Sequence, residues 1–306
     1  MSTETEHAPG RTARARGLTL AAGCAFTLVA GVACGGTQDE TESDEGLAGN
    51  PVDLGDVQTV EREDLASAFE DAGADGTFVL FDAGESSAVV VNPDEAEERA
   101  VPASTFKLPN TLIALQTGAV ESIDEVVSPE GEDELSLREA LPTTDVPVHQ
   151  EVADRVGYDR MSTWVDRFDY GNRQVGDEDV MDRFWLDGPL EISAVEQSTF
   201  ISELARTELP VDVEHQEALH ELLAIEEGNG YQLYGRTGLG ADVDPTPGWW
   251  VGWVEGEDDL HTFALRLEVE EDSDVVLRED VGRELLVELE VLPPEALEAP
   301  EETQGD

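Results

Sequence analysis

Basic residues are scarce in this sequence. It holds 17 Lys and Arg against 71 Asp and Glu over 306 residues, which gives a formal net charge of −54. Such a polyanion has no counterions to gain by approaching nucleic acid, so non-specific nucleic-acid binding is excluded. Lysine is the rarest basic residue, because Lys107 is the only one in the chain. Arginine stays protonated, whereas a desolvated lysine can lose its proton and then act as a base.

The excess of carboxylates is typical of proteins adapted to concentrated salt, where screening weakens the repulsion between like charges. An acidic outlier from an ordinary organism is the alternative interpretation. Hydrophobic residues make up 40% of the chain, with 9 Phe and 5 Trp among them. This is enough apolar material for a folded core, so the chain is not a disordered acidic polymer.

Cysteine is nearly absent, since Cys24 and Cys34 are the only two. Cys24 lies in an uncharged apolar run, residues 17–33, that follows an arginine-bearing start, which is the layout of a signal peptide. The run is short for a bilayer span of about 20 residues, so we expect residues 1–33 to be removed. Cys34 resembles a bacterial lipoprotein cleavage site, although Gly31 stands where such sites usually carry Leu. The mature chain then has no internal disulfide.

Composition divides the rest of the chain into three parts. Residues 34–52 hold acidic, small and hydroxyl side chains with almost nothing to bury, so we expect a flexible tether. Residues 53–292 have the size of one catalytic domain. Residues 293–306, rich in Pro and Glu, are expected to form a disordered tail. The protein is thus expected to be secreted across the inner membrane and to lie in the periplasm or at the cell surface, held by a lipid on Cys34.

Hydrophobic periodicity predicts an α/β fold. Helices are expected at 148–156, 211–225 and 279–289, and another is expected to open at Ser104 with a first turn distorted by Pro109. Strands are expected in an early hairpin, 76–82 with 87–91, and in a late pair, 248–255 with 260–269. Strands at both ends with helices between them indicate a mostly antiparallel sheet that combines N- and C-terminal segments.

Ser104 and Lys107 are three positions apart. On a helix this spacing puts both side chains on one face, with β-carbons about 5–6 Å apart. A serine hydroxyl becomes a nucleophile when a nearby base takes its proton, and a neutral lysine is such a base. Ser-x-x-Lys alone is a weak signal, because both residue types are common on solvated helix faces. The use of the chain's only lysine favours the catalytic interpretation.

Several motifs in order give a more specific signal. They lie at 102–115 around Ser104 and Lys107, at Tyr170-Gly171-Asn172, at 184–197, at 235–238 and at 251–254. Together they resemble the class D, or oxacillinase-type, serine β-lactamases, from about Gly76 to Leu292. The resemblance implies a β-lactamase/transpeptidase-like fold, with helices on both sides of the sheet and a helical subregion.

The resemblance also implies the chemistry. Ser104 would open the β-lactam ring and become acylated. Lys107 would be carbamylated by carbon dioxide or bicarbonate and would be the base for acylation and deacylation, with no other cofactor. The Trp185 indole would hold the carbamate, whereas without the family Trp185 reads as a core aromatic residue. An apolar pocket would favour the neutral amine. The expected walls are Phe106, Val146, Trp185 and Leu186.

Substrate recognition would fall on Arg236-Thr237-Gly238, where the family has Lys-Thr-Gly. Thr237 and the cation beside it would orient the substrate carboxylate, and the backbone N–H groups of Ser104 and Leu239 would form an oxyanion hole. Arginine keeps the charge and adds a forked set of donors, but it removes a group able to pass a proton.

Arg278 falls where the family has a carboxylate-binding arginine. The alternative is an ordinary ion pair at a helix start, with Glu279 or Asp280. A second departure is Thr144-Asp145-Val146, where the family has Ser-x-Val. Thr144 keeps a hydroxyl able to relay a proton, though its methyl group restricts rotation. A carboxylate at Asp145 would favour the protonated form of a nearby lysine, so we expect hydrolysis at a reduced rate.

His215 and His220 are five positions apart and do not share a helix face, so we expect no metal site. Three other functions stay open. They are a penicillin sensor that stays acylated, a D,D-peptidase acting on cell-wall peptides, and a surface protein with a decayed site. The sequence shows no large membrane-spanning signalling region, which argues against the sensor, whereas Arg236 and Asp145 favour it.

Overall fold

The computed structural model describes residues 57–84, 87–143, 146–240, 243–257 and 259–297. The expected signal peptide, lipidation site and tether lie outside the described residues. Among the residues that are described, no helix combines the length and the apolar character needed to cross a bilayer.

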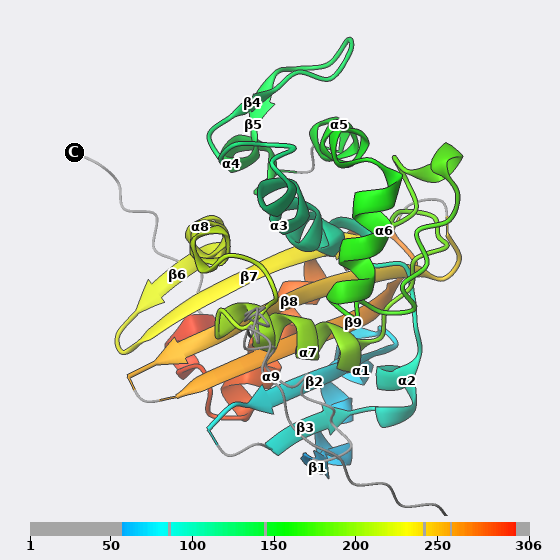
Figure 1. Cartoon of the computed structure of the whole chain (residues 1–306). Helices are drawn as coiled ribbons and strands as arrows, with labels where there is room; N and C mark the ends of the chain where they lie inside the picture. Colours follow the sequence, from blue (N-terminus) through cyan, green and yellow to red (C-terminus); the bar gives the residue numbers. More distant parts are fainter. Residues whose placement is uncertain (1–56, 85–86, 144–145, 241–242, 258, 298–306) are drawn as a thin grey trace, which may run out of the picture. The chain divides into compact units, whose positions relative to one another are not determined.

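A seven-stranded sheet with the order β1-β3-β2-β9-β8-β7-β6 forms the framework of the described residues (Figure 1). Only β1 and β3 pair in parallel, and the other neighbours are antiparallel. The N-terminal β2 lies beside the C-terminal β9, as the sequence predicts. The strands are β1 (Gln58–Glu61), β2 (Gly76–Asp82), β3 (Ser87–Val91), β6 (Ala224–Gly228), β7 (Tyr231–Leu239), β8 (Thr246–Gly256) and β9 (Leu260–Val269), with a separate hairpin of β4 (Val126–Val127) and β5 (Leu135–Ser136).

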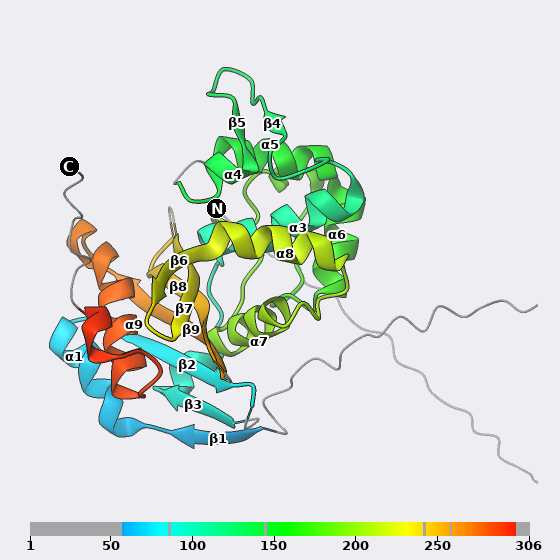
Figure 2. The same cartoon turned by 90° about the vertical axis from the view of Figure 1, so that its left-hand side faces the viewer.

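Helices cover both faces of the sheet (Figures 1 and 2). One face packs against α1 (Ser67–Ala72) and α9 (Leu277–Glu288). The other face carries the larger group: α2 (Pro93–Glu97), α3 (Lys107–Thr117), α4 (Leu137–Ala140), α5 (Pro147–Val156), α6 (Tyr158–Arg167), α7 (Ala194–Ala205) and α8 (Val213–Leu223). Short 3₁₀ turns lie at Glu63–Ala66, Ala103–Phe106, Glu178–Val180, Asp272–Val276 and Pro294–Leu297.

The pattern of β8 explains why the sheet has two cores. Successive side chains of a strand point to opposite faces. Trp249, Val251 and Trp253 accordingly belong to the core under α3 and α7, whereas Trp250 and Val254 belong to the core under α9. A strand that is apolar on both faces must be covered on both faces, and this requires the helices on either side.

The expected fold class is confirmed, and both predicted strand pairs are present. The early hairpin pairs Phe81 with Ala88, and the late pair aligns Val251 with Ala264. The helices expected at 148–156 and 279–289 are present as α5 and α9 with small shifts at their ends.

Three boundaries differ from expectation. The helix expected to end at Ile225 stops at Leu223, because the next residues form β6 and pair with β7. No helix opens at Ser104. A 3₁₀ turn contains it, and α3 begins at Lys107. The tail was expected to be disordered from Pro293 onward, but residues 294–297 form a 3₁₀ turn that buries Ala296. The carbonyl of Ala296 accepts a hydrogen bond from Arg283 at 3.2 Å.

Candidate active site

The turn that carries Ser104 is held in an unusual backbone conformation. Its first residue, Ala103, has φ 50°, a region that is unfavourable for residues with a β-carbon. The N–H of Ala103 donates to the Trp185 carbonyl at 2.9 Å, which fixes this conformation. The Lys107 N–H then donates to the Ser104 carbonyl. Because residues i and i+3 eclipse in such a turn, Ser104 and Lys107 lie on one side of it.

Lys107 is buried at the start of α3. It is 2% exposed, and its Nζ donates to the backbone carbonyl of Thr143 at 3.0 Å. The neighbouring Phe106 packs its ring against Phe184 and Trp185, with centroids 5.0 and 5.4 Å apart. Pro109 is tolerated in the first turn of α3, where backbone N–H groups have no partner within the helix. The amine is therefore shielded from bulk water while Ser104 is only half-buried.

The loop that carries Trp185 is fastened by the motif Tyr170-Gly171-Asn172. The Asn172 side chain donates to the Pro189 carbonyl at 2.9 Å and accepts from the Glu191 N–H at 3.2 Å. Gly171 has φ 55°, and a β-carbon there would lie 2.1 Å from the Glu191 carbonyl oxygen. The motif thus positions the carbonyl of Trp185 that holds Ala103.

One face of strand β7 packs against the turn. A β-carbon at Gly238 would lie 3.0 Å from the Thr105 Cγ2 and 3.3 Å from the Pro102 carbonyl oxygen, so only glycine fits without displacing them. The pairing of β6 with β7 ends at Tyr234. The outer edge from Gly235 onward therefore has no strand beside it among the described residues. This edge brings the segment 236–239 next to Ser104.

Arg236 reaches from β7 to the loop before α5. Its Nη2 donates to the Thr143 carbonyl at 2.8 Å, the same oxygen that accepts from Lys107. Burial, and then the charge of Arg278, lower the pKa of Arg236 to about 10. A cavity of about 210 Å³ adjoins this strand edge. It is lined by Gly235, Arg236 and Thr237, by Leu141 and Pro142, by residues 222–225, and by Trp250 and Glu279.

Arg278 is bound to the same strand from the side of α9. It is 9% exposed, its Nη1 donates to the Gly238 carbonyl at 2.6 Å, and its Nε donates to the Val275 carbonyl at 2.6 Å. Burial lowers its pKa. Within the described ranges it forms no ion pair within 4.0 Å, so the alternative of an ordinary pair with Glu279 or Asp280 does not hold.

Comparison with known proteins identifies the family to which this chain is similar. The penicillin-binding protein transpeptidase domain matches residues 76–286. The chain is 33% identical over 229 residues to β-lactamase OXA-10 of Pseudomonas aeruginosa, covering 71% of this chain and 85% of that protein. It is 32% identical over 241 residues to β-lactamase OXA-48 of Klebsiella pneumoniae, covering 76% of this chain and 90% of that protein.

Solved structures agree. The class D β-lactamase FUS-1 (OXA-85) of Fusobacterium nucleatum subsp. polymorphum superposes with a TM-score of 0.73 at 34% identity, covering 76% of this chain and all of the other. The class D β-lactamase YbXI of Nostoc also has a TM-score of 0.73, at 30% identity, with the same coverage. The chain belongs to the class D β-lactamases.

The structure places most of the residues expected for a class D β-lactamase around one turn. Ser104, Lys107, Arg236, Thr237, Gly238, Leu239 and Arg278 come together there, and Trp185 is joined to the same turn through its backbone. Val146, half-buried, immediately precedes α5. Thr144 and Asp145 lie outside the described residues.

Sequence reasoning overlooked His149. It is 1% exposed on α5, and both of its ring nitrogens lack a hydrogen-bond partner among the described residues. Burial, and then the charges of Lys107 and Arg236, hold the pKa of His149 well below its usual range. No motif marks such a residue, since a single histidine in an apolar helix carries no signal of its own.

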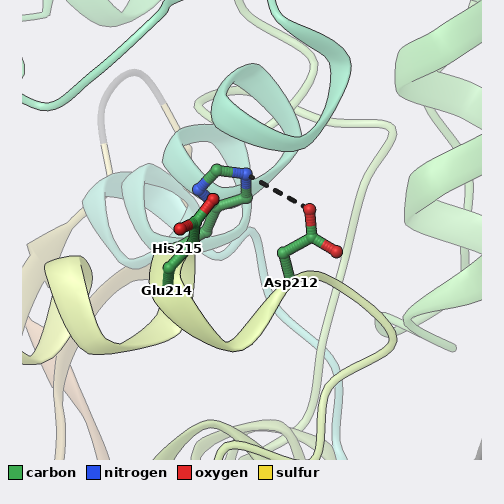
Figure 3. A group of neighbouring side chains, drawn as sticks. All are labelled: Asp212, Glu214 and His215. Atoms are coloured by element: carbon green, nitrogen blue, oxygen red, sulfur yellow. Dashed lines mark ion pairs between the residues drawn. The ribbon is translucent and has the colours of Figure 1, made fainter.

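One group in the described residues could hold a cation. Asp212, Glu214 and His215 have ligand atoms within 4.8 Å of one another at the start of α8, away from Ser104 in sequence (Figure 3). His215 Nε2 lies 3.9 Å from Asp212 Oδ2. The two carboxylates are exposed, and a helix N-terminus repels cations, so the group offers little affinity. His220, weighed in the sequence as a possible ligand, is within hydrogen-bond distance of the Leu204 carbonyl, at 2.9 Å.

Proposed function

We propose that the protein hydrolyses the amide bond of β-lactams through an acyl-enzyme on Ser104. The proposal rests on one arrangement: a half-buried serine, a buried lysine one turn later, and an open strand edge with two arginines against the same turn. The names of the relatives, β-lactamases in each case, support the substrate class.

Lys107 would act as the base in both halves of the reaction. In acylation the Ser104 hydroxyl gives its proton to the Lys107 side chain while Oγ bonds to the lactam carbonyl carbon. The ring C–N bond breaks and the nitrogen takes up a proton. In deacylation a water gives a proton to the same side chain and attacks the ester carbon, and Ser104 leaves with its hydroxyl restored.

The backbone of β7 supplies the second donor for the developing oxyanion. N–H groups along a strand alternate in direction. The Gly240 N–H donates inward to the Pro247 carbonyl on β8 at 2.9 Å, so the N–H of Leu239 points to the outer edge. Together with the N–H of Ser104 it would hold the negative oxygen of the tetrahedral intermediate.

Thr237 and the two arginines would orient the substrate carboxylate. Arg278 has its Nη1 and Nε fixed on backbone carbonyls, which aims the remaining amino group without further loss of side-chain entropy. The buried, positively charged strand edge attracts an anionic substrate.

We further propose that carbon dioxide carbamylates Lys107. The residue fits this modification, because it is buried beside Phe106, which stacks on Trp185, and it is the only lysine in the chain. A carbamate supplies an anionic base at a position where an ammonium supplies none.

Turnover of a chromogenic cephalosporin by the purified protein tests the proposal. The assay is run in dilute and molar salt, with and without added bicarbonate, and intact mass is followed in parallel. Ser104→Ala is compared with Ser67→Ala, an exposed serine of α1 on the opposite face of the sheet.

We expect continuous turnover that bicarbonate increases, lost in Ser104→Ala and kept in Ser67→Ala. A lasting stoichiometric adduct without turnover would instead assign the protein to penicillin sensing. Cleavage of cell-wall peptides without turnover of β-lactams would assign it to the D,D-peptidases. No reaction with either would mean a decayed site.

Export and anchoring through Cys34 are also proposed, on the sequence of residues 1–34 alone. Expression in a bacterial host with labelled palmitate should label the full chain. Cys34→Ala should lose the label and release the protein from the membrane fraction, and equal membrane association of both would refute the anchor.

A further inference from the structure

Two cationic side chains share one oxygen in the site. Lys107 Nζ and Arg236 Nη2 donate to the Thr143 carbonyl at 3.0 and 2.8 Å. Because both bonds end on the same atom, the two nitrogens lie within a few ångström of each other. The charges come from α3 and β7, so the fold itself brings them together.

Arg236 is poorly compensated in this position. Within the described parts of the chain it forms no ion pair within 4.0 Å, and its Nε is buried without an acceptor. Arg236 is half-buried, and a partly desolvated cation without a carboxylate lowers the free energy of any anion that forms beside it. The positive charge of Arg236 is therefore not offset by an ion pair in the described residues, and it acts on the groups around Lys107.

A third element, α5, also faces this pair of charges through His149. The pKa of His149 is depressed by burial and by the charges of both Lys107 and Arg236. The positive potential of the pair thus extends to a third element, and the neutral imidazole does not offset it.

We propose that Arg236 is a positioning residue for Lys107, whose guanidinium opposes a positive charge on the Lys107 amine and attracts the negative charge that carbamylation creates. The inference rests on the proposed function. In carbamylation the amine nitrogen bonds to the carbon of carbon dioxide; a neutral amine releases one proton to solvent in this step and an ammonium releases two. Arg236 favours the products in both respects, because they carry more negative charge.

Among the described residues, titratable groups approach Lys107 and Arg236 from three other elements or strands of the fold. His149 approaches from α5 and Arg236 from β7, and α9 places Arg278 and Glu279 near Arg236. Asp145 lies outside the described residues, and its carboxylate is the group expected from sequence to act in the opposite direction.

Carbon-13 NMR of the protein titrated with ¹³C-bicarbonate tests the inference, because it detects the carbamate without substrate. Arg236→Gln removes the charge at similar size, and Arg236→Lys keeps the charge. Arg278→Gln is the matched control, since it removes a buried guanidinium of α9 that donates to the same strand but does not bond to Thr143. Circular dichroism checks that each variant is folded.

We expect Arg236→Gln to raise the bicarbonate concentration for half-carbamylation about tenfold or more, as for two charges a few ångström apart in a partly buried site. The pH midpoint of carbamate formation should rise by about one unit. Arg236→Lys should stay within about threefold of the parent, and Arg278→Gln should leave carbamylation unchanged while raising KM.

An unchanged half-carbamylation point in Arg236→Gln, with only KM raised, would overturn the inference and leave the proposed hydrolysis standing. A parent protein that turns over β-lactams but gives no carbamate signal would overturn both the inference and the carbamylation of Lys107. A loss as large in Arg278→Gln as in Arg236→Gln would also overturn it, because the effect would then belong to the general field.

Discussion

Arginines on the surface and arginines in the site have different partners. On the surface, Arg138 Nε lies 2.6 Å from the Asp124 carboxylate, and Arg173 Nη1 lies 3.0 Å from Asp169. In the site, Arg236 and Arg278 donate to backbone carbonyls instead. In the part that the structure describes, a chain with about four acids for each base pairs exposed arginines such as Arg138 and Arg173 with carboxylates, whereas Arg236 and Arg278 form no ion pair within 4.0 Å.

The pKa values follow the same division. The hydrogen bond that Arg138 donates to the Asp124 carboxylate raises the pKa of Arg138, whereas burial lowers the pKa of Arg236 to about 10 and also lowers that of Arg278. The comparison teaches that a net charge of −54 does not neutralise the site, because the exposed carboxylates are screened by water and salt while the buried guanidinium groups are not.

The largest expected effect is at the buried amine. Lys107→Arg keeps the positive charge but replaces a group that can be neutral with one that stays protonated. We expect kcat for a chromogenic cephalosporin to fall at least about a thousandfold, the same as in Lys107→Ala, because neither variant has a base for the Ser104 proton. Activity of either variant at the parent level would show that another group is the base.

The next largest effect distinguishes an arginine of the site, Arg278, from an arginine of the surface, Arg138. Arg278→Ala removes the guanidinium proposed to bind the substrate carboxylate, and a charge-assisted bond of this kind is worth about 2 kcal/mol, so kcat/KM should fall about thirtyfold, mainly through KM. Arg138→Ala removes an exposed ion pair and should match the parent in kcat/KM and in melting temperature. Equal losses in both variants would abolish the distinction between surface and site.

Salt should raise the stability of the protein through its exposed carboxylates and leave the chemistry of the site unchanged. Raising KCl from 0.1 to 1 M shortens the screening length from about 10 to about 3 Å, which weakens the repulsion among exposed carboxylates. We expect the melting temperature to rise by several degrees. Protein that is equally stable at both concentrations would refute adaptation to salt. Carbamylation of Lys107, followed by NMR, should change little over the same range.

The smallest effect concerns an acid that is partly buried. Burial is the main cause that raises the pKa of Glu203 to about 7, from an ordinary value near 4.5. The folded state therefore retains a proton that the unfolded state releases between these values, so this group makes stability fall as pH rises from about 4.5 to 7. Glu203→Gln should be about 1 kcal/mol more stable than the parent at pH 8, after allowance for solvent screening, and similar at pH 4.

The control for that measurement is Glu217→Gln, which removes one exposed charge from α8. Urea unfolding of the parent, Glu203→Gln and Glu217→Gln at pH 4, 6 and 8 gives the free energies of unfolding that test this prediction. If Glu217→Gln gained as much as Glu203→Gln, relief of net charge rather than burial would explain the stabilisation.

The sequence was most informative where local pattern and tertiary role agree. The apolar segment 248–255 predicted a strand, and the strand is buried on both faces as its consecutive tryptophans require. Ser104 and Lys107 were predicted to share one side of a helix, and a 3₁₀ turn achieves the same result through its i to i+3 register. The capping box Ser193–Glu196 was also readable and would have located α7, which was overlooked.

Features that depend on distant pairing could not be read. The apolar pattern continues to Ile225, yet the chain leaves the helix at Ala224 because the edge of β7 provides hydrogen bonds for a strand there. The bond from Arg236 to the Thr143 carbonyl joins positions 93 residues apart and uses a backbone acceptor, which no sequence motif marks. The position of His149 near Lys107 and Arg236 is likewise a product of tertiary packing.

The unpaired outer edge of β7 has a consequence for solubility. Bare strand edges recruit strands from other molecules and so promote aggregation. At Gly238 the turn bearing Ser104 packs closely against the face of this same strand. A substitution that loosened the turn would thus act twice, by displacing Ser104 and by freeing the face of a strand whose edge is already a template for intermolecular pairing.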